Sequence, residues 1–213
     1  MMVFLLCILL AISGCGGHHD AQQMVKFLNT NANDEGIAYF SKEIEKNPQK
    51  AFAYHHRATF LIKKASSISG LTDDEKIKLY NQAIADEDVA ISLTLSEATI
   101  PRIFVDTYTD LATGKQVIDP NDKLRVMQSK SKYYITLNRT AVISRANYSI
   151  FRSELLSHSG KFKEAIDSYN EFIMFYQKQP EKIIKLNPDL KSMVQAAKQD
   201  LEKLKLELAK KRG

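Results

Sequence analysis

The chain has 213 residues, of which 44% are hydrophobic and 26% are charged, a composition typical of one globular domain or a short repeat array. Eight glycines and five prolines are too few for an architecture of many short strands and turns. The net charge of +5 comes from charges that are interspersed along the chain. We find no basic patch interleaved with aromatic residues, so the sequence does not indicate a nucleic-acid partner.

Residues 1–14 carry no charge and are almost wholly apolar. As a helix they would span roughly 21 Å, which is short of the roughly 30 Å hydrocarbon core of a bilayer. We therefore predict a signal peptide rather than a membrane-spanning helix. No lysine or arginine precedes the apolar run, so the usual positive region is missing unless the true start lies upstream.

This segment ends in Ile-Ser-Gly-Cys at residues 12–15, with an aliphatic and two small residues before the cysteine. The pattern resembles the lipobox of bacterial lipoproteins, which implies that Cys15 is acylated and becomes the mature amino terminus. A plain cleaved signal peptide with an incidental cysteine is the alternative. Cys7 would be removed, leaving no disulfide, thiol nucleophile or cysteine metal site. In that family Gly16 does not favour inner-membrane retention, so an outer-membrane anchor facing the periplasm is favoured.

Residues 15–21 are predicted to be a lipidated tether between the membrane and the fold. Two adjacent histidines, His18 and His19, have no third ligand nearby in the sequence, so we interpret them as part of a solvated linker rather than a metal site. Apolar residues at steps of three and four then predict three helices, at 22–28, 36–48 and 51–62.

After a polar loop at 66–70, Thr72 and Glu75 form a capping-box pattern that predicts the start of a helix continuing through Leu93. Further helices are expected at 101–112, 119–137, 145–159 and 162–173, the last two separated by Gly160. A final helix follows Asn187-Pro188, with apolar residues at alternating steps of four and three: Leu190, Val194, Ala197, Leu201, Leu204 and Leu208.

Residues 80–93 contain an aromatic residue, an Ala-Ile pair three positions later and a second such pair seven positions further on. This pattern resembles the second helix of a tetratricopeptide repeat, as do residues 36–48 and 162–173, and residues 51–62 resemble its first helix. The resemblance implies an all-α solenoid of about four helix pairs over residues 22–180, the third pair degenerate. Residues 181–213 would form a capping helix.

We find no glycine-rich phosphate loop, no His-Glu-x-x-His motif and no nucleophile elbow. His55 and His56 are adjacent on a predicted helix and point about 100° apart, so they cannot easily share a metal. We expect these two residues, and His158, to face solvent or a groove. We therefore predict no catalytic residues, no metal, no cofactor and no enzymatic activity.

In the tetratricopeptide family the first helix of each pair lines a concave surface. Applied here, the resemblance implies a mixed apolar and polar groove lined by Phe52, His55, Thr59, Lys63, Asn147, Ile150, Glu154 and His158. These residues lack the lysines and asparagines that hold a terminal carboxylate in some members, so no carboxylate clamp is predicted. Docking of a helix or an extended peptide is expected instead.

These features predict a membrane-anchored adaptor or scaffold in the bacterial cell envelope. By resemblance, it would serve outer-membrane assembly, secretion or pilus assembly, or cell-wall enzymes. Its expected partners are another envelope protein or peptide and the membrane through Cys15, without nucleic acid or a small-molecule substrate. The alternative is a structural lipoprotein that forms oligomers through its C-terminal helix, whose apolar seam could pair as a coiled coil.

Overall fold

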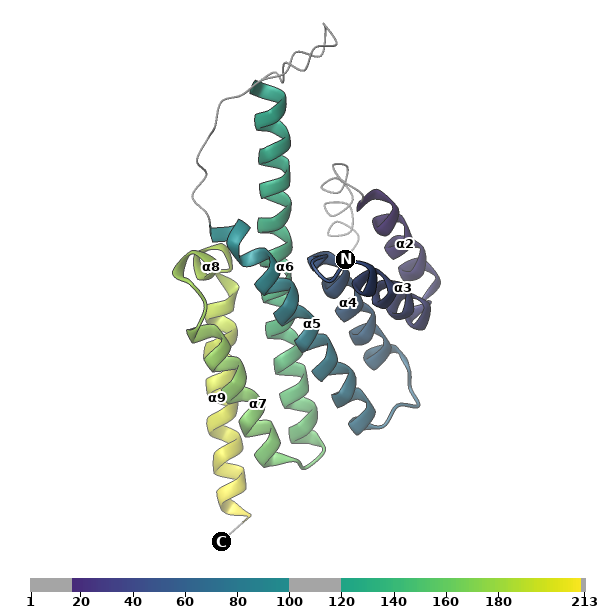
Figure 1. The fold of residues 1–213 in the computed structure, drawn as a ribbon. Helices are drawn as coiled ribbons and strands as arrows, with labels where there is room; N and C mark the ends of the chain where they lie inside the picture. The colour runs from purple at the N-terminus through teal and green to yellow at the C-terminus, as the bar shows by residue number, and fades with distance from the viewer. Residues whose placement is uncertain (1–16, 100–119, 212–213) are drawn as a thin grey trace, which may run out of the picture.

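The structure is a computed structural model that describes residues 17–99 and 120–211, and within these ranges it contains helices and no strands. The all-α prediction is confirmed. The helices in chain order are α2 (Gly17–Thr30), α3 (Asn33–Lys46), α4 (Ala51–Ser67), α5 (Asp73–Thr99), α6 (Pro120–His158), α7 (Phe162–Gln177), α8 (Glu181–Leu186) and α9 (Asp189–Lys210) (Figure 1). The predicted signal peptide, Cys15 and the predicted helix at 101–112 lie outside the described residues.

The helix boundaries follow the signals expected from the sequence. At the start of α5, the Thr72 amide donates to Glu75 Oε2 at 2.8 Å and the Glu75 amide donates to Thr72 Oγ1 at 3.3 Å, so the capping box is confirmed. α3 ends directly before Asn47-Pro48, and α9 begins directly after Asn187-Pro188. Two short local patterns therefore place the ends of three helices.

Gly160 ends α6 in a left-handed conformation with φ of 74°. Its amide donates to the Ser157 carbonyl at 3.0 Å, and the Lys161 amide donates to the Leu156 carbonyl at 2.9 Å. These two bonds form a Schellman motif, which satisfies carbonyls that a helix end otherwise leaves unpaired. The predicted break at Gly160 is confirmed.

The largest difference from prediction is α6, because the helices expected at 119–137 and 145–159 form one helix of 39 residues. Residues 138–144 between them contain neither glycine nor proline, so nothing in the backbone interrupts the helix. Asn138 is 1% exposed, and its side-chain amide donates to Thr94 Oγ1 on α5 at 2.9 Å. This polar residue therefore joins two helices where a turn was expected.

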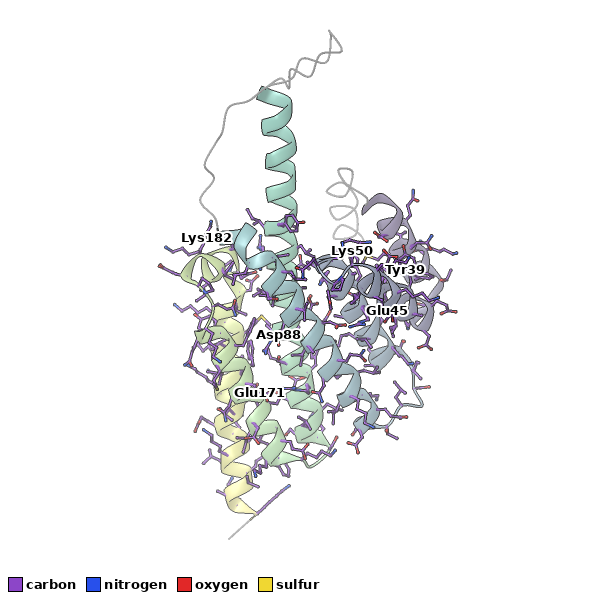
Figure 2. The ribbon with its side chains drawn as sticks, viewed as in Figure 1. Tyr39, Glu45, Lys50, Asp88, Glu171 and Lys182 are labelled. Atoms are coloured by element: carbon purple, nitrogen blue, oxygen red, sulfur yellow. The ribbon has the colours of Figure 1, made fainter. Side chains whose placement is uncertain are left out.

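The predicted tether at 15–21 is wrong from Gly17 onward, because the chain is helical from that residue. Asp20 is 3% exposed, accepts a hydrogen bond from the Tyr39 hydroxyl at 2.6 Å and pairs with Lys50 at 2.8 Å. Its partners, Tyr39 on α3 and Lys50 at the start of α4, are labelled in Figure 2. These contacts fix α2 against α3 and the start of α4. The short helix α8 was also not expected, and its Ile183 is fully buried.

Each helix packs mainly against its neighbour in the chain, in the order α3, α4, α5, α6 and α7, with α9 against α7 (Figure 1). The core of the described residues is accordingly divided into three clusters along the array. One lies among α2, α3 and α4, the second joins α4, α5 and α6, and the third joins α5 through α9. Such consecutive packing is characteristic of elongated helical arrays.

Gly36 lets α3 and α4 approach closely. A Cβ atom added to Gly36 would lie 2.7 Å from Cγ of the Phe60 ring, which is closer than real Cβ contacts. Phe60 is fully buried and stacks on Phe40, with ring centroids 5.9 Å apart. A residue without a side chain is therefore required where the Phe60 ring of α4 meets α3.

The apolar stripe of α9 is covered by its own chain. Five of its six predicted members are no more than 5% exposed and belong to the third core cluster: Leu190, Val194, Ala197, Leu201 and Leu204. Leu206 lies outside the stripe and is 63% exposed. The packing of α9 on α7 therefore uses the residues that a seam with a partner would need.

Candidate functional site

The α4 half of the predicted groove is largely internal. His55 and His56 are 6% and 5% exposed, so the expectation that they face solvent or a groove is wrong. Nδ1 of His55 lies 3.0 Å from both carboxylate oxygens of Glu87 on α5. The sequence did not reveal this partner because the two residues meet only when α4 and α5 pack.

The remaining α4 residues of the predicted groove are half-buried. Phe52 packs against the His56 ring, with centroids 5.5 Å apart, and the Thr59 hydroxyl donates to the His55 carbonyl at 3.0 Å. Lys63 is half-buried near the end of the helix. Phe52 also packs on the Phe40 ring of α3, with centroids 6.5 Å apart, and Thr59 lies in hydrogen-bonding reach of Tyr148 on α6, so α4 does not present the expected open surface.

The α6 half of the predicted groove divides in two. Asn147 and Ile150 are half-buried, and Ile150 packs against the third core cluster. Glu154 and His158 are exposed and line one cleft. The structure thus brings two of the eight predicted residues together at an open site.

Residues 86–88 of α5 are three consecutive acids, and each of them pairs with a different basic residue on a neighbouring helix. Asp86 receives two hydrogen bonds from the Arg57 guanidinium of α4, at 2.6 and 2.8 Å. Asp88, labelled in Figure 2, pairs with Nε of Arg145 on α6 at 2.9 Å. Glu87, between them, is fully buried against the α4 histidine described above. The three acids therefore connect α5 to both neighbouring helices.

Burial raises the pKa of Glu87 to about 7, although the charge of His55 and its hydrogen bond oppose the shift. Burial alone would lower the pKa of His55, but the charge and hydrogen bond of Glu87 raise it above its usual value. The pKa of His56 is held well below its usual value, first by burial and then by the charge of His55. With both partners closed to water, this cluster is a structural connection rather than a binding surface.

Tyr148 of α6 closes the cluster from the third helix. Burial and the charge of Glu87 raise the pKa of its hydroxyl, which lies in hydrogen-bonding reach of Ser144 and Thr59. Tyr148 is 9% exposed, so the polar contacts among α4, α5 and α6 are sealed. A substrate could not reach them without separating the helices.

An open cleft of about 440 Å³ lies among α6, α7 and α9. The C-terminal ends of α6 and α9 lie at the same end of the array (Figure 1). Its lining residues come from these three helices: Glu154, Ser157, His158, Tyr169, Asp200, Lys203, Leu204 and Glu207. The end of α6 at Gly160 and the packing of α9 on α7 together create this space. This cleft is the candidate functional site.

Tyr169 of α7 lines the cleft while being only 4% exposed. Its hydroxyl forms no hydrogen bond with any residue that the structure describes. Burial, followed by the charges of Asp200 and Glu154, raises the pKa of this hydroxyl to about 12. The hydroxyl is not among the buried, unpaired side-chain atoms of the described residues, so it reaches the water of the open cleft.

The sequence did not identify Tyr169 or the α9 residues of the cleft, because Tyr169 read as core and α9 as a cap. A usable signal was present in α9. Asp200, Lys203 and Glu207 follow one another at steps of three and four, beside the apolar stripe. Charged residues on the border of a packed stripe mark the edge of an interface, where a cleft can open.

Within the described ranges, no group of three or more potential ligands among His, Cys, Asp and Glu is arranged to hold a metal ion. None of the helices over 17–99 and 120–211 has the length and hydropathy required to cross a bilayer. Comparison of the chain with protein-family models, with curated proteins and with solved structures finds no match.

Proposed function

We propose that this chain is a lipid-anchored adaptor of the bacterial cell envelope that binds another protein at the cleft between α6, α7 and α9. The observation that supports this proposal is the open cleft of about 440 Å³ with the unpartnered hydroxyl of Tyr169. Cavities of roughly 300–1,000 Å³ are typical of ligand sites in proteins. The cleft is large enough to hold one or two side chains of a partner.

We also infer that the helices form a tetratricopeptide-like array. In support, the small residues of the resembling segments, Ala58, Ala83 and Ala165, are all fully buried where helices meet. Small residues at such positions let helices approach closely. The single helix α6 departs from the family pattern, so the array would be irregular in its middle.

The lipid anchor is proposed from the lipobox-like residues 12–15 and would attach the protein through Cys15. More than one acyl chain is needed for stable attachment to a bilayer, and the acylated cysteine of this family carries more than one. The residue at position 16 favours the outer membrane, facing the periplasm. The corresponding roles are outer-membrane assembly, secretion or pilus assembly, or scaffolding of cell-wall enzymes.

Association through the C-terminal helix has less support, because the stripe that would form the seam is buried within the chain. The exposed side of α9 offers Leu206 as an isolated apolar residue. Single exposed apolar residues are common on protein surfaces. We therefore favour an adaptor that binds its partner at the cleft.

The test is site-specific photo-crosslinking of the full-length, lipidated protein in its own host. A crosslinker at Ser157, in the cleft, should capture a discrete partner band, whereas one at Glu45, exposed on α3, should not (Figure 2). The two variants should be compared in cells of equal expression level. Identical bands at both positions, or none at Ser157, would reject the cleft as the docking site.

A further inference from the structure

The cleft has uncompensated negative charge. Three carboxylates and one lysine line it, and the lysine, Lys203, pairs with Asp200 at 2.9 Å. Glu154 and Glu207 form no ion pair with any residue in the described part of the chain. Two carboxylates therefore remain available at the cleft, although the chain as a whole carries a charge of +5.

The position of the cleft adds to this polarity. Glu154, Ser157 and His158 lie in the last turns of α6, which ends at His158. The carboxyl end of a helix carries a partial negative charge from its carbonyl groups and favours a nearby cation. Both the side chains and the backbone therefore favour a positively charged ligand.

The Tyr169 hydroxyl supplies an uncharged hydrogen-bonding group in the same cleft. The residue as a whole is 4% exposed, its hydroxyl is open to the cleft, and the hydroxyl has no protein partner among the described residues. A phenol oxygen can accept a hydrogen bond from an N–H donor. Leu204, also 4% exposed, provides an apolar wall beside it.

We propose that the cleft binds an alkylammonium group, and that this group is the side chain of a lysine on the partner protein. An ammonium group carries a positive charge and three donors, which suit a cleft lined by unpaired carboxylates and a free hydroxyl, and its aliphatic stem can pack on Leu204. This inference rests on the proposed adaptor function, because it specifies the chemistry of the partner at the same cleft.

The test uses the full-length chain in a non-ionic detergent and short peptides that carry an uncharged fluorophore. A Gly-Lys-Gly-Lys-Gly peptide should bind saturably by fluorescence anisotropy, and the same peptide with norleucine should not. The double variant Glu154→Gln/Glu207→Gln should weaken the binding by about tenfold or more, since it removes both free charges. Tyr169→Phe should weaken it severalfold, and Glu45→Gln, which removes an exposed acid on α3, should leave it unchanged.

Equal binding of the lysine and norleucine peptides, or unchanged binding in the double variant, would overturn the inference, provided that circular dichroism shows the variants folded. Spermidine is the second arm. If it displaces the peptide at a much lower concentration than unlabelled lysine peptide does, the ammonium group comes from a free polyamine and the assignment to a partner lysine is rejected.

The crosslinking experiment separates this inference from the adaptor function. The crosslinker stands at Ser157 and Glu154 stays native. If the partner band persists in Glu207→Gln/Tyr169→Phe, the adaptor function is kept and recognition of an ammonium group is rejected. A band lost in that variant and kept in Glu45→Gln would support both.

Discussion

Nδ1 of His55 on α4 lies equally close, at 3.0 Å, to the two carboxylate oxygens of Glu87 on α5, and Glu87 is fully buried. Both groups have raised pKa values, so the folded state holds their protons at pH values where the unfolded state releases them. Proton binding is thereby linked to the packing of α4 on α5.

The pair makes the stability of the fold depend on pH with a defined sign. The pKa of Glu87 rises from 4.5 to about 7, so its contribution to stability falls as the pH rises through that window. The raised pKa of His55 acts in the same direction, because its stabilisation is present below 6.5 and is lost above its raised value. Relative to Glu87→Gln, the wild type should lose roughly 1–3 kcal/mol of unfolding free energy between about pH 5 and pH 8.

Urea unfolding of both proteins at several pH values, followed by circular dichroism, measures this difference. Other titrating groups contribute equally to the pH dependence of both proteins, so they largely cancel in the difference. His56 is one of them, and its lowered pKa makes the fold more stable as the pH rises. A difference that stays constant with pH, or grows in favour of the wild type as the pH rises, would contradict the linkage.

Gly36→Ala should destabilise the fold by about 1–3 kcal/mol, because the new methyl group would overlap the Phe60 ring. Gly70→Ala is the matched control, since no atom lies within 4 Å of its Cβ position, and it should change stability by less than about 0.5 kcal/mol. Denaturant midpoints of the two variants provide the comparison. Equal effects at the two glycines would show that the close approach at Gly36 is absent.

Gly160→Ala should cost about 1–2 kcal/mol, because alanine is strained at a φ of 74°. Gly160→Asn should cost less, since asparagine tolerates the left-handed region better. Open space surrounds the Cβ position, so steric overlap does not contribute. Thermal unfolding of the pair tests the ranking, and an alanine variant as stable as wild type would exclude this helix end.

The two leucines of α9 separate internal packing from an oligomer seam. Leu201 is 5% exposed and Leu206 is 63% exposed. Leu201→Ala should lower stability by about 2–5 kcal/mol, and Leu206→Ala by less than about 0.5 kcal/mol. Neither substitution should change the sedimentation coefficient of the folded protein. If Leu206→Ala dissociated an oligomer, the structural-lipoprotein alternative would replace the adaptor.

Cys15→Ala should abolish incorporation of labelled palmitate in the native host and move the protein from the membrane fraction. The acyl chains, and not an apolar helix, are expected to hold the mature protein on the bilayer. Cys7→Ala is the matched control, because Cys7 lies in the predicted signal peptide. Labelling that survives Cys15→Ala would reject the anchor.

Local patterns were sufficient to predict helix ends, since the capping box at Thr72 and the glycine at 160 act within a few residues. The same rules failed at residues 138–144, where a break between two predicted helices was expected. The sequence there lacks a helix breaker, and the buried contact of Asn138 with Thr94 depends on a helix 44 residues away. A long-range contact of this kind leaves no trace in local spacing.

The candidate site was predicted in part. Glu154 and His158, named as groove residues from the family resemblance, are exposed and line the cleft, but a partner at that cleft stays a prediction. Tyr169 was expected only in the core, because it falls at an apolar position of the helical stripe. The stripe does not show that the same residue also borders a cleft. His55 was misplaced because the sequence alone does not show that an acid on α5 meets it.

The three consecutive acids of α5 have a consequence for how this array avoids misassembly. Apolar stripes alone do not fix the rotation of a helix, because the helix can shift or turn by one residue and still bury leucine and alanine. Successive side chains on a helix differ by about 100° in direction, so Asp86, Glu87 and Asp88 fit their three partners in one rotational setting only. A misrotated α5 would leave buried charges unmatched, at a high energetic cost. The acids therefore disfavour rotated or shifted positions of α5 that hydrophobic contacts alone would allow, and so they specify one packing.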